Sequence, residues 1–195
     1  MENQYRFITF DGNAGAGKTT STRFLNSHLG IPILARRHID WTLTHMQRFL
    51  FDLMERHVSF RDTRDLVTDE YYYPLWRLWK AEKSDKDYIL KLMLDALNAR
   101  DGRLPTHSFY LDITIEESKY RYFERAMKET VIDMPVRDHV IELSECEKQL
   151  GEDACLFWNW MSEKIETVHI IDAMRPEQEV QSEILQIIGE HNAVE

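Results

Sequence analysis

Residues 12–19 form a complete phosphate-binding loop motif, Gly-x-x-x-x-Gly-Lys-Thr. The motif follows the apolar run 7–10, so a strand would lead into the loop and a helix would follow it. Glycines at 12, 15 and 17 permit a tight turn and a close approach to phosphate oxygens. Because the N–H groups at a helix start converge on an anion, the sequence predicts a nucleoside triphosphate site.

The whole loop is predicted to contact the triphosphate. Lys18 supplies positive charge there, and the Thr19 hydroxyl supplies a magnesium ligand. The alternative is a glycine-rich turn that merely joins a strand to a helix, although several constraints are met together here. The predicted contacts are Gly12, Asn13, Ala14, Gly15, Ala16, Gly17, Lys18, Thr19 and Thr20.

Size and charge limit the function classes. The chain has 195 residues, of which 43% are hydrophobic, so we expect a single domain over 1–195 with a sizeable core. A formal net charge of −10 argues against a protein that coats nucleic acid, because the backbone phosphates would be repelled. Phosphate groups would have to be met by local arginines and magnesium.

Cysteine usage and hydropathy indicate the compartment. Cys146 and Cys155 are the only cysteines, and their spacing fits no metal-ligand pattern. The N-terminus does not resemble a secretory leader, and no apolar stretch is long enough to cross a bilayer. We therefore expect a reduced, cytoplasmic protein with no membrane role.

Short apolar runs alternate with helical spacing along the chain. This alternation predicts an α/β fold with a parallel sheet, whose ligands bind at the carboxyl ends of the strands. The expected strands are 7–10, 31–35, 66–68, 108–111 and 168–171.

Helices are expected where apolar residues recur at intervals of three and four, over 46–54 and 75–103. A further helix should start at the capping box formed by Thr114 and Glu117. The last should run from Pro176 to Gly189. The weakly periodic, charged segment 127–153 is interpreted as a long surface insertion or a mobile cover.

Three segments together resemble the thymidylate kinase family, over nearly the whole chain. The resemblance implies a P-loop kinase three-layer sandwich, with a five-stranded parallel sheet, helices on both faces and a short lid at about 121–140. It also implies a homodimer that transfers the γ-phosphoryl group of magnesium-bound ATP to a deoxynucleoside monophosphate, dTMP or a related one. The segments are Phe7–Gly12 before the loop, Phe109–Asp112 followed by Arg121 and Arg125, and Ile171–Ala173 followed by Arg175 and Pro176.

The resemblance assigns catalytic residues. Arg121 and Arg125 take the places of lid arginines, and their spacing of four puts both on one helix face. The alternative is a solvated charged face that pairs with Glu117 or Glu124. Asp69 matches an acidic residue that helps to hold magnesium together with Thr19, and Lys18 is the loop cation.

The remaining assignments concern the two bases and the acceptor. Ala173, Met174 and Arg175 resemble the loop that holds the adenine. Either Arg36 or Arg37 would grip the acceptor phosphate, and Arg56 is a second candidate or an ordinary helix-terminal cation. Gln47 could read a base edge, and the aromatic residues of 71–79 form either a stacking wall or core packing. The acceptor-site candidates are Asp11, Arg36, Arg37, Gln47, Arg56, Glu70 and Tyr71.

Two departures from the family leave other functions open. Glu70 stands where the family has arginine, and Ala14 stands where many members have a carboxylate. The loop sequence is closer to that of deoxynucleoside kinases, which phosphorylate the nucleoside hydroxyl. That reaction needs a carboxylate base, for which Asp40 or Glu70 is available. A degenerate homologue that binds nucleotide without rapid chemistry is the third hypothesis.

Overall fold

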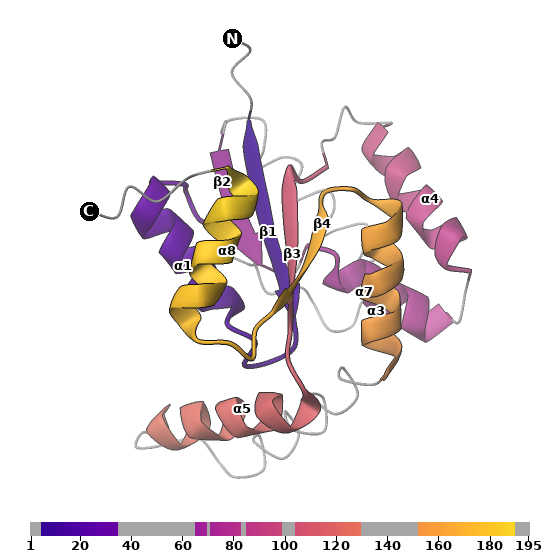
Figure 1. Cartoon of the computed structure of the whole chain (residues 1–195). Helices are drawn as coiled ribbons and strands as arrows, with labels where there is room; N and C mark the ends of the chain where they lie inside the picture. Colours follow the sequence, from indigo (N-terminus) through magenta and orange to yellow (C-terminus); the bar gives the residue numbers. More distant parts are fainter. Residues whose placement is uncertain are drawn as a thin grey trace. The chain divides into compact units, whose positions relative to one another are not determined.

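The computed structural model describes residues 5–34, 65–69, 71–82, 85–98, 104–129 and 152–189 (Figure 1). Strands and helices alternate over these residues, as the sequence predicts. In chain order the elements are β1 (Arg6–Gly12), α1 (Lys18–Leu29), β2 (Asp65–Asp69), α3 (Tyr73–Glu82), α4 (Lys86–Asn98), β3 (His107–Asp112), α5 (Ile115–Glu129), α7 (Glu152–Lys164), β4 (Val168–Asp172) and α8 (Glu177–Ile188).

The strands form an α/β fold with a parallel sheet, which has four strands within the described residues, in the order β2-β1-β3-β4. Strand β1 pairs with β2 in parallel, in a register that runs from Arg6 opposite Asp65 to Phe10 opposite Asp69. The predicted α/β class is therefore confirmed. The five-strand count is not confirmed, and the three-layer arrangement with its lid stays a prediction.

The predicted strand at 31–35 is only a single parallel bridge between Ile33 and Val67 in the described part of the chain. Val67 N–H donates to the Pro32 carbonyl, and Leu34 N–H donates to the Val67 carbonyl, both at 2.9 Å. Pro32 has no N–H of its own, which limits the ladder that this segment can form. Ala35 lies outside the described residues.

The chain divides into two compact units, which we describe separately. The first comprises Met1–Asp11 and Thr22–Ser108, and the second comprises Gly12–Ser21 and Phe109–Glu195. The prediction of one domain over 1–195 is not tested by this division.

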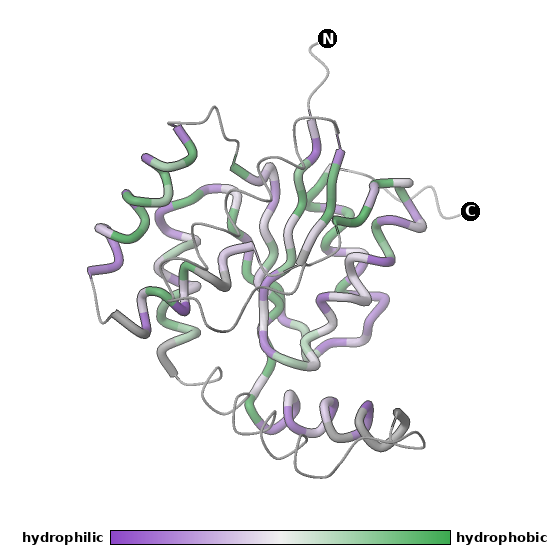
Figure 2. Tube along the Cα trace, turned by 180° about the vertical axis from the view of Figure 1, so that it is seen from behind, coloured by the Kyte–Doolittle hydropathy of each residue, from purple (hydrophilic) through white to green (hydrophobic). Residues whose placement is uncertain are grey.

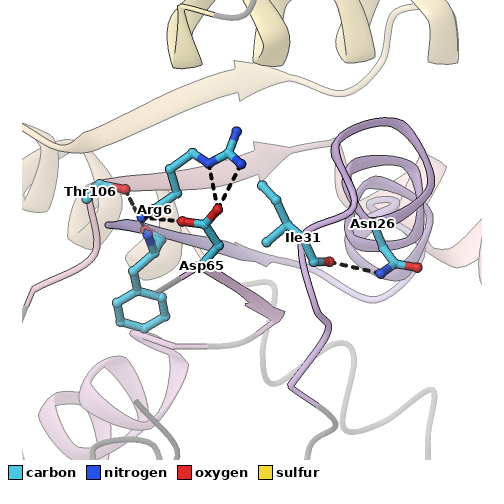
Figure 3. Close-up of polar contacts among 6 residues, drawn as sticks. Arg6, Asn26, Ile31, Asp65 and Thr106 are labelled. Carbon is cyan, nitrogen blue, oxygen red and sulfur yellow. Dashed lines mark hydrogen bonds and ion pairs between the residues drawn. The ribbon is translucent and has the colours of Figure 1, made fainter. Parts of the chain in front are cut away.

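Polar contacts hold the strand ends of the first unit (Figure 3). The Arg6 guanidinium donates to Asp65 from both Nε and a terminal nitrogen, at 3.1 and 2.8 Å, while Arg6 N–H donates to the other carboxylate oxygen. Thr106 makes two hydrogen bonds to the Phe7 backbone, because its hydroxyl accepts from Phe7 N–H and donates to the Phe7 carbonyl. At the end of α1, the Asn26 amide donates to the Ile31 carbonyl. These bonds fix β1, the strand that leads into the phosphate loop.

The aromatic residues that follow β2 belong to the core of the first unit. Tyr71, Tyr72 and Trp76 are all less than 10% exposed. Tyr71 meets the rings of Phe7 and Tyr72 edge-on, with centroid separations of 5.1 and 4.9 Å. For these residues the structure supports core packing over a base-stacking wall. Helices α3 and α4, which pack against each other, replace the single helical region expected over 75–103.

In the second unit, helix α7 packs against β4 and was not predicted. The Trp158 ring of α7 stacks on Tyr110 of β3 with centroids 4.7 Å apart, and Phe157 and Met161 are fully buried. The insertion predicted over 127–153 begins and ends in helix, since α5 reaches Glu129 and α7 starts at Glu152. Its remaining residues, like the helix predicted over 46–54, lie outside the described residues.

Two helix ends agree with the predicted signals. The Thr114 hydroxyl accepts a 3.2 Å hydrogen bond from Glu117 N–H, as in the first half of a capping box. Helix α8 begins after Pro176 and ends at Gly189, which adopts a left-handed conformation with φ of 80°. Its inward residues Val180, Ile184 and Leu185 are buried, as predicted. Within the part of the chain that the structure describes, no helix combines the length and apolar character of a membrane span.

Candidate phosphate-binding site

The predicted phosphate loop connects β1, which ends at Gly12, to α1, which begins at Lys18. Gly12, Gly15 and Gly17 have φ values of 144°, 75° and 96°, which side-chain-bearing residues rarely adopt. Ala16 N–H donates to the Asn13 carbonyl at 3.1 Å and closes the turn. The strand, turn and helix context that the motif requires is therefore present.

Packing within the second unit fixes two of the glycines. A Cβ at Gly12 would lie 2.6 Å from the Leu111 carbonyl oxygen, so β3 leaves no room for a side chain there. A Cβ at Gly15 would lie 3.0 Å from Arg121 Cβ and 3.2 Å from the Ser118 carbonyl oxygen, both on α5. Nothing lies within 4 Å of a Cβ at Gly17, where only the backbone conformation demands glycine.

The start of α1 is electropositive. Its first turn contains no acidic residue, whereas α5 and α8 each carry two glutamates there. The partial positive charge of the helix start is therefore not neutralised by its own side chains. Lys18 adds a full charge, and its Nζ donates to the Gly12 and Asn13 carbonyls at 2.7 and 3.0 Å. Thr19 and Thr20 are exposed at this helix start.

Helix α5 docks on the phosphate loop. The fully buried Ser118 hydroxyl donates to the Ala14 carbonyl at 2.6 Å. Tyr122, one turn later and 6% exposed, packs with Ala14 and Ile115. The first half of α5 is thus attached to the loop by a hydrogen bond and an apolar contact.

The two predicted lid arginines lie on α5, along which hydrophilic residues recur (Figure 2). Arg121 Nε pairs with the Glu117 carboxylate at 2.6 Å, and both side chains are 29% exposed. The exposed Arg125 places its guanidinium carbon 5.4 Å from the Tyr122 ring centroid. The alternative of an intrahelical ion pair is therefore realised for Arg121, whose Cβ nevertheless lies against the loop at Gly15.

The predicted adenine loop is a tight turn after β4. Ala173 is buried and donates its N–H to the Asp112 carbonyl at 2.8 Å. The Asp172 carboxylate accepts from Met174 N–H at 2.9 Å, and Arg175 pairs with both Asp172 and Glu183. Met174 stays 44% exposed, so its thioether is available at the surface of a well-fixed turn.

Carboxylates stand at the ends of β3 and β4, which are neighbours in the sheet. Burial and the nearby negative charge of Asp172 raise the pKa of Asp112, while a contact from the Cys155 thiol lowers it. That contact joins Cys155 Sγ and an Asp112 carboxylate oxygen at 3.9 Å, and burial and Asp112 raise the pKa of Cys155 in turn.

The acceptor candidates that the structure describes belong to the first unit. Asp11 is only 1% exposed, and its carboxylate accepts a 3.1 Å hydrogen bond from Tyr72 N–H. It therefore ties β1 to the segment that follows β2. Tyr71 is buried against Phe7. Asp69 is the last residue of β2, opposite Phe10 in the register.

Other predicted acceptor residues lie outside the described residues. They are Arg36, Arg37, Gln47, Arg56 and Glu70. Within the described ranges, no three His, Cys, Asp or Glu side chains form a group that could hold a metal ion.

Ser118 and Tyr122, the residues that attach α5 to the loop, were not among the predicted site residues. Together with Ile115 they lie at spacings of three and four, which places them on one face of the helix. This stripe of small and apolar residues among charged ones was the available signal.

The described residues form an α/β fold that is similar to the fold of P-loop kinases. Solved structures of deoxyadenosine kinase from M. mycoides are similar to this chain. The structure with bound dATP has a TM-score of 0.60 at 13% identity and covers 95% of this chain and 100% of that chain. The structures with bound dCTP, and with products dCMP and a flexible dCDP, have TM-scores of 0.58 and 0.60 at 13% and 15% identity. Each covers 94% of this chain and 98% of that chain.

No protein-family model matches the chain, and no curated protein matches it. At these identities the structural similarity establishes the fold alone. Membership of the thymidylate kinase family specifically is not confirmed.

Alanine at two loop glycines should separate packing from backbone strain. We expect Gly17→Ala to cost about 1–2 kcal/mol, because alanine must adopt a positive φ without meeting any neighbour. Gly12→Ala should cost a further 1–3 kcal/mol, roughly, because its Cβ must displace the Leu111 carbonyl. Equilibrium urea unfolding measures both values. Equal losses in the two variants would contradict the close packing of Gly12 on β3.

The folding stability of the Asp112→Asn variant, relative to that of the wild type, should increase as the pH rises. The raised pKa means that the folded state holds the Asp112 proton more tightly than the unfolded state. Ionisation therefore lowers the stability of the wild type as the pH rises from the ordinary value of 3.8 through the folded-state pKa. This loss of stability is constant at pH values above both pKa values and absent at pH values below both.

Urea unfolding of both proteins at a series of pH values measures this difference. Asp95→Asn, on the exposed face of α4, controls for the loss of one negative charge. A stability difference that does not change with pH, or that falls as the pH rises, would contradict the assigned direction.

Proposed function

We propose that this protein is an ATP-dependent phosphotransferase whose acceptor is a deoxynucleoside monophosphate, with dTMP the first candidate. The observation that carries the proposal is the phosphate loop itself. Three positive-φ glycines lead into a helix whose first turn holds Lys18 and no acidic residue. Such a helix start binds anions through converging N–H groups and the helix dipole.

The loop residues 12–20 bind the triphosphate of ATP in this proposal. Backbone N–H groups from Ala14 to Thr19 and the Lys18 ammonium contact the β- and γ-phosphates. Lys18 then exchanges its bonds to the Gly12 and Asn13 carbonyls for bonds to phosphate oxygens. The loop carbonyls keep the ammonium close to the place where the negative charge arrives.

Thr19 fits the protein's share of a magnesium site, since magnesium keeps several waters and takes few protein ligands beside phosphate oxygens. Its hydroxyl is exposed next to Lys18 at the start of α1. We propose Asp69, at the end of β2, as the second contributor. When bound, the ion would neutralise phosphate charge during transfer.

Arg121 and Arg125 stabilise the transferred group. Phosphoryl transfer passes through a loose transition state in which charge spreads over the phosphoryl oxygens, so positioned cations lower the barrier. The Arg121 side chain starts at the loop, where its Cβ faces Gly15. To act, its guanidinium must exchange the carboxylate of Glu117, with which it forms a partly exposed ion pair, for the phosphate, and ion pairs near the surface contribute little free energy.

The turn after β4 holds the adenine. Met174 offers exposed thioether surface, and the Arg175 guanidinium is fixed beside it by Asp172 and Glu183. The side chain of Ala173 is small and buried, so the base can approach the backbone at this position. An apolar surface beside a planar cation suits a purine ring.

For the acceptor, we assign the phosphate to Arg36 or Arg37 together with Arg56, and the base to Gln47. Glu70 and Tyr71 are the remaining acceptor-site residues in this proposal. Asp11 holds the segment next to them in place, because its carboxylate accepts a hydrogen bond from Tyr72 N–H. An acceptor phosphate is already nucleophilic near neutral pH and needs no strong general base. A homodimer and a cytoplasmic location remain predictions from the sequence.

The second candidate is transfer to a deoxynucleoside hydroxyl. It is favoured by the similarity to structures of deoxyadenosine kinase and by the wording of the loop, and it is as well supported as the first. This reaction needs a carboxylate base beside the hydroxyl, for which Asp40 or Glu70 is available. The two candidates share the triphosphate site and differ only in the acceptor.

Substrate profiling tests the proposal. Purified protein with magnesium and ATP is assayed for ADP release with each deoxynucleoside and each monophosphate. Turnover should occur with a monophosphate, dTMP first, and Lys18→Ala should reduce it about 100-fold or more. Lys91→Ala, an exposed lysine on α4, is the matched control and should keep full activity.

Each other outcome is informative. Turnover with deoxynucleosides but with no monophosphate would replace the first candidate by the second. Stabilisation by nucleotide in thermal melting without ADP release would indicate a binding protein rather than an enzyme. Full activity in Lys18→Ala, or no effect of any nucleotide, would overturn the phosphotransferase proposal.

A further inference from the structure

Ser118 makes an unusual contact for a serine inside a helix. Such serines commonly donate to a carbonyl of their own helix, one turn back. The Ser118 hydroxyl instead donates to the Ala14 carbonyl, 104 residues earlier in the chain, at 2.6 Å. The side chain is fully buried, so water does not compete for this bond.

The bond fixes the orientation of one peptide group of the phosphate loop. In a trans peptide the C=O and the following N–H point in opposite directions, and the structure has no cis peptide bond among the described residues. Because the Ala14 carbonyl faces Ser118 on α5, the Gly15 N–H must face away from α5. Gly15 has a φ of 75°, and glycine accepts several backbone conformations at little cost. The peptide group before it therefore needs an outside contact to hold one orientation.

The same docking sets the position of Arg121. A Cβ at Gly15 would meet Arg121 Cβ at 3.0 Å, and Tyr122 packs on Ala14, so the second turn of α5 lies directly on the loop. Ser118 and Arg121 are three residues apart on this turn. A single hydrogen bond thus bears on both the loop peptide and the helix that carries the arginine.

We propose that Ser118 is a positioning residue for phosphoryl transfer. Its hydroxyl holds the Ala14–Gly15 peptide so that the Gly15 N–H faces the bound triphosphate, and it holds α5 so that Arg121 reaches the transferred group. The inference rests on the proposed function, because it assigns a triphosphate to this loop. It adds a residue that touches neither nucleotide.

Selective ¹⁵N-glycine labelling gives a direct readout, since the chain has only seven glycines. In the wild type, a non-hydrolysable magnesium–ATP analogue should shift the amide signals of Gly12, Gly15 and Gly17 and leave that of Gly189 at the end of α8 unchanged. In Ser118→Ala, the Gly15 signal should already differ without nucleotide. The analogue concentration that half-saturates its shift should rise about tenfold, as expected for the loss of one buried hydrogen bond.

Three variants complete the test. Ser118→Thr keeps a hydroxyl and should restore the wild-type Gly15 response. Ser162→Ala removes a serine hydroxyl that donates within its own helix, to the Asn159 carbonyl of α7, and should change nothing at the loop. If Ser118→Ala does not fold, as judged by loss of the Gly189 signal, Ser118→Cys replaces it, because the thiol fills the space of the hydroxyl but is only a weak donor.

Activity provides a readout that a purely structural role would not move. With the acceptor found by profiling and with saturating ATP, Ser118→Ala should lower kcat while the KM for the acceptor stays unchanged, because the variant alters the loop and α5 and none of the proposed acceptor residues. Ser118→Thr should recover kcat.

The outcomes separate this inference from the proposed function. If the wild-type Gly12, Gly15 and Gly17 signals do not respond to the analogue, the triphosphate site itself is wrong. If they respond and Ser118→Ala responds at the same concentration with the same kcat, the role of Ser118 is overturned. A wild-type response at Gly12 and Gly17 without one at Gly15 would also overturn it.

Discussion

The structure depends on a backbone path that only glycine can follow, between the end of β1 and the start of α1. Gly12 passes so close to the Leu111 carbonyl of β3 that a Cβ would stand 2.6 Å from its oxygen. Gly15 passes beside α5, where a Cβ would stand 3.0 Å from Arg121 Cβ. This path brings the electropositive start of α1 to a defined place, against β3 and α5. The remaining assignments follow from what surrounds that helix start.

Local charge opposes the charge of the whole chain. The protein carries a formal net charge of −10, yet the first turn of α1 has no acidic residue and contains Lys18. The nearby cations are each held by weak or exchangeable partners. Lys18 contacts two loop carbonyls, Arg121 contacts the partly exposed carboxylate of Glu117, and Arg125 contacts an aromatic ring. An arriving triphosphate could replace such partners at low cost, whereas the negative net charge of the chain opposes its approach.

Local signals in the sequence predicted much of this structure. The loop motif with its flanking strand and helix, the helix start marked by Thr114 and the helix end at Gly189 depend on neighbouring residues alone. Each was found as predicted, although only the first half of the capping box is formed. The contacts that depend on distant residues were missed. Two such contacts depend on how separate elements pack. They are the hydrogen bond from Ser118 to Ala14 and the buried hydrogen bond from Tyr72 N–H to the Asp11 carboxylate. The predicted strand at 31–35 gives one bridge in the described residues, because Pro32 interrupts its donors.

Every role assigned to this site requires that the loop at 12–19 bind the tail of a nucleoside triphosphate. The decisive measurement is a crystal structure with a non-hydrolysable ATP analogue and magnesium. The β- and γ-phosphates should lie at the start of α1, with Lys18 Nζ moved from the Gly12 and Asn13 carbonyls onto phosphate oxygens. An analogue bound elsewhere, with Lys18 still on those carbonyls, would contradict it.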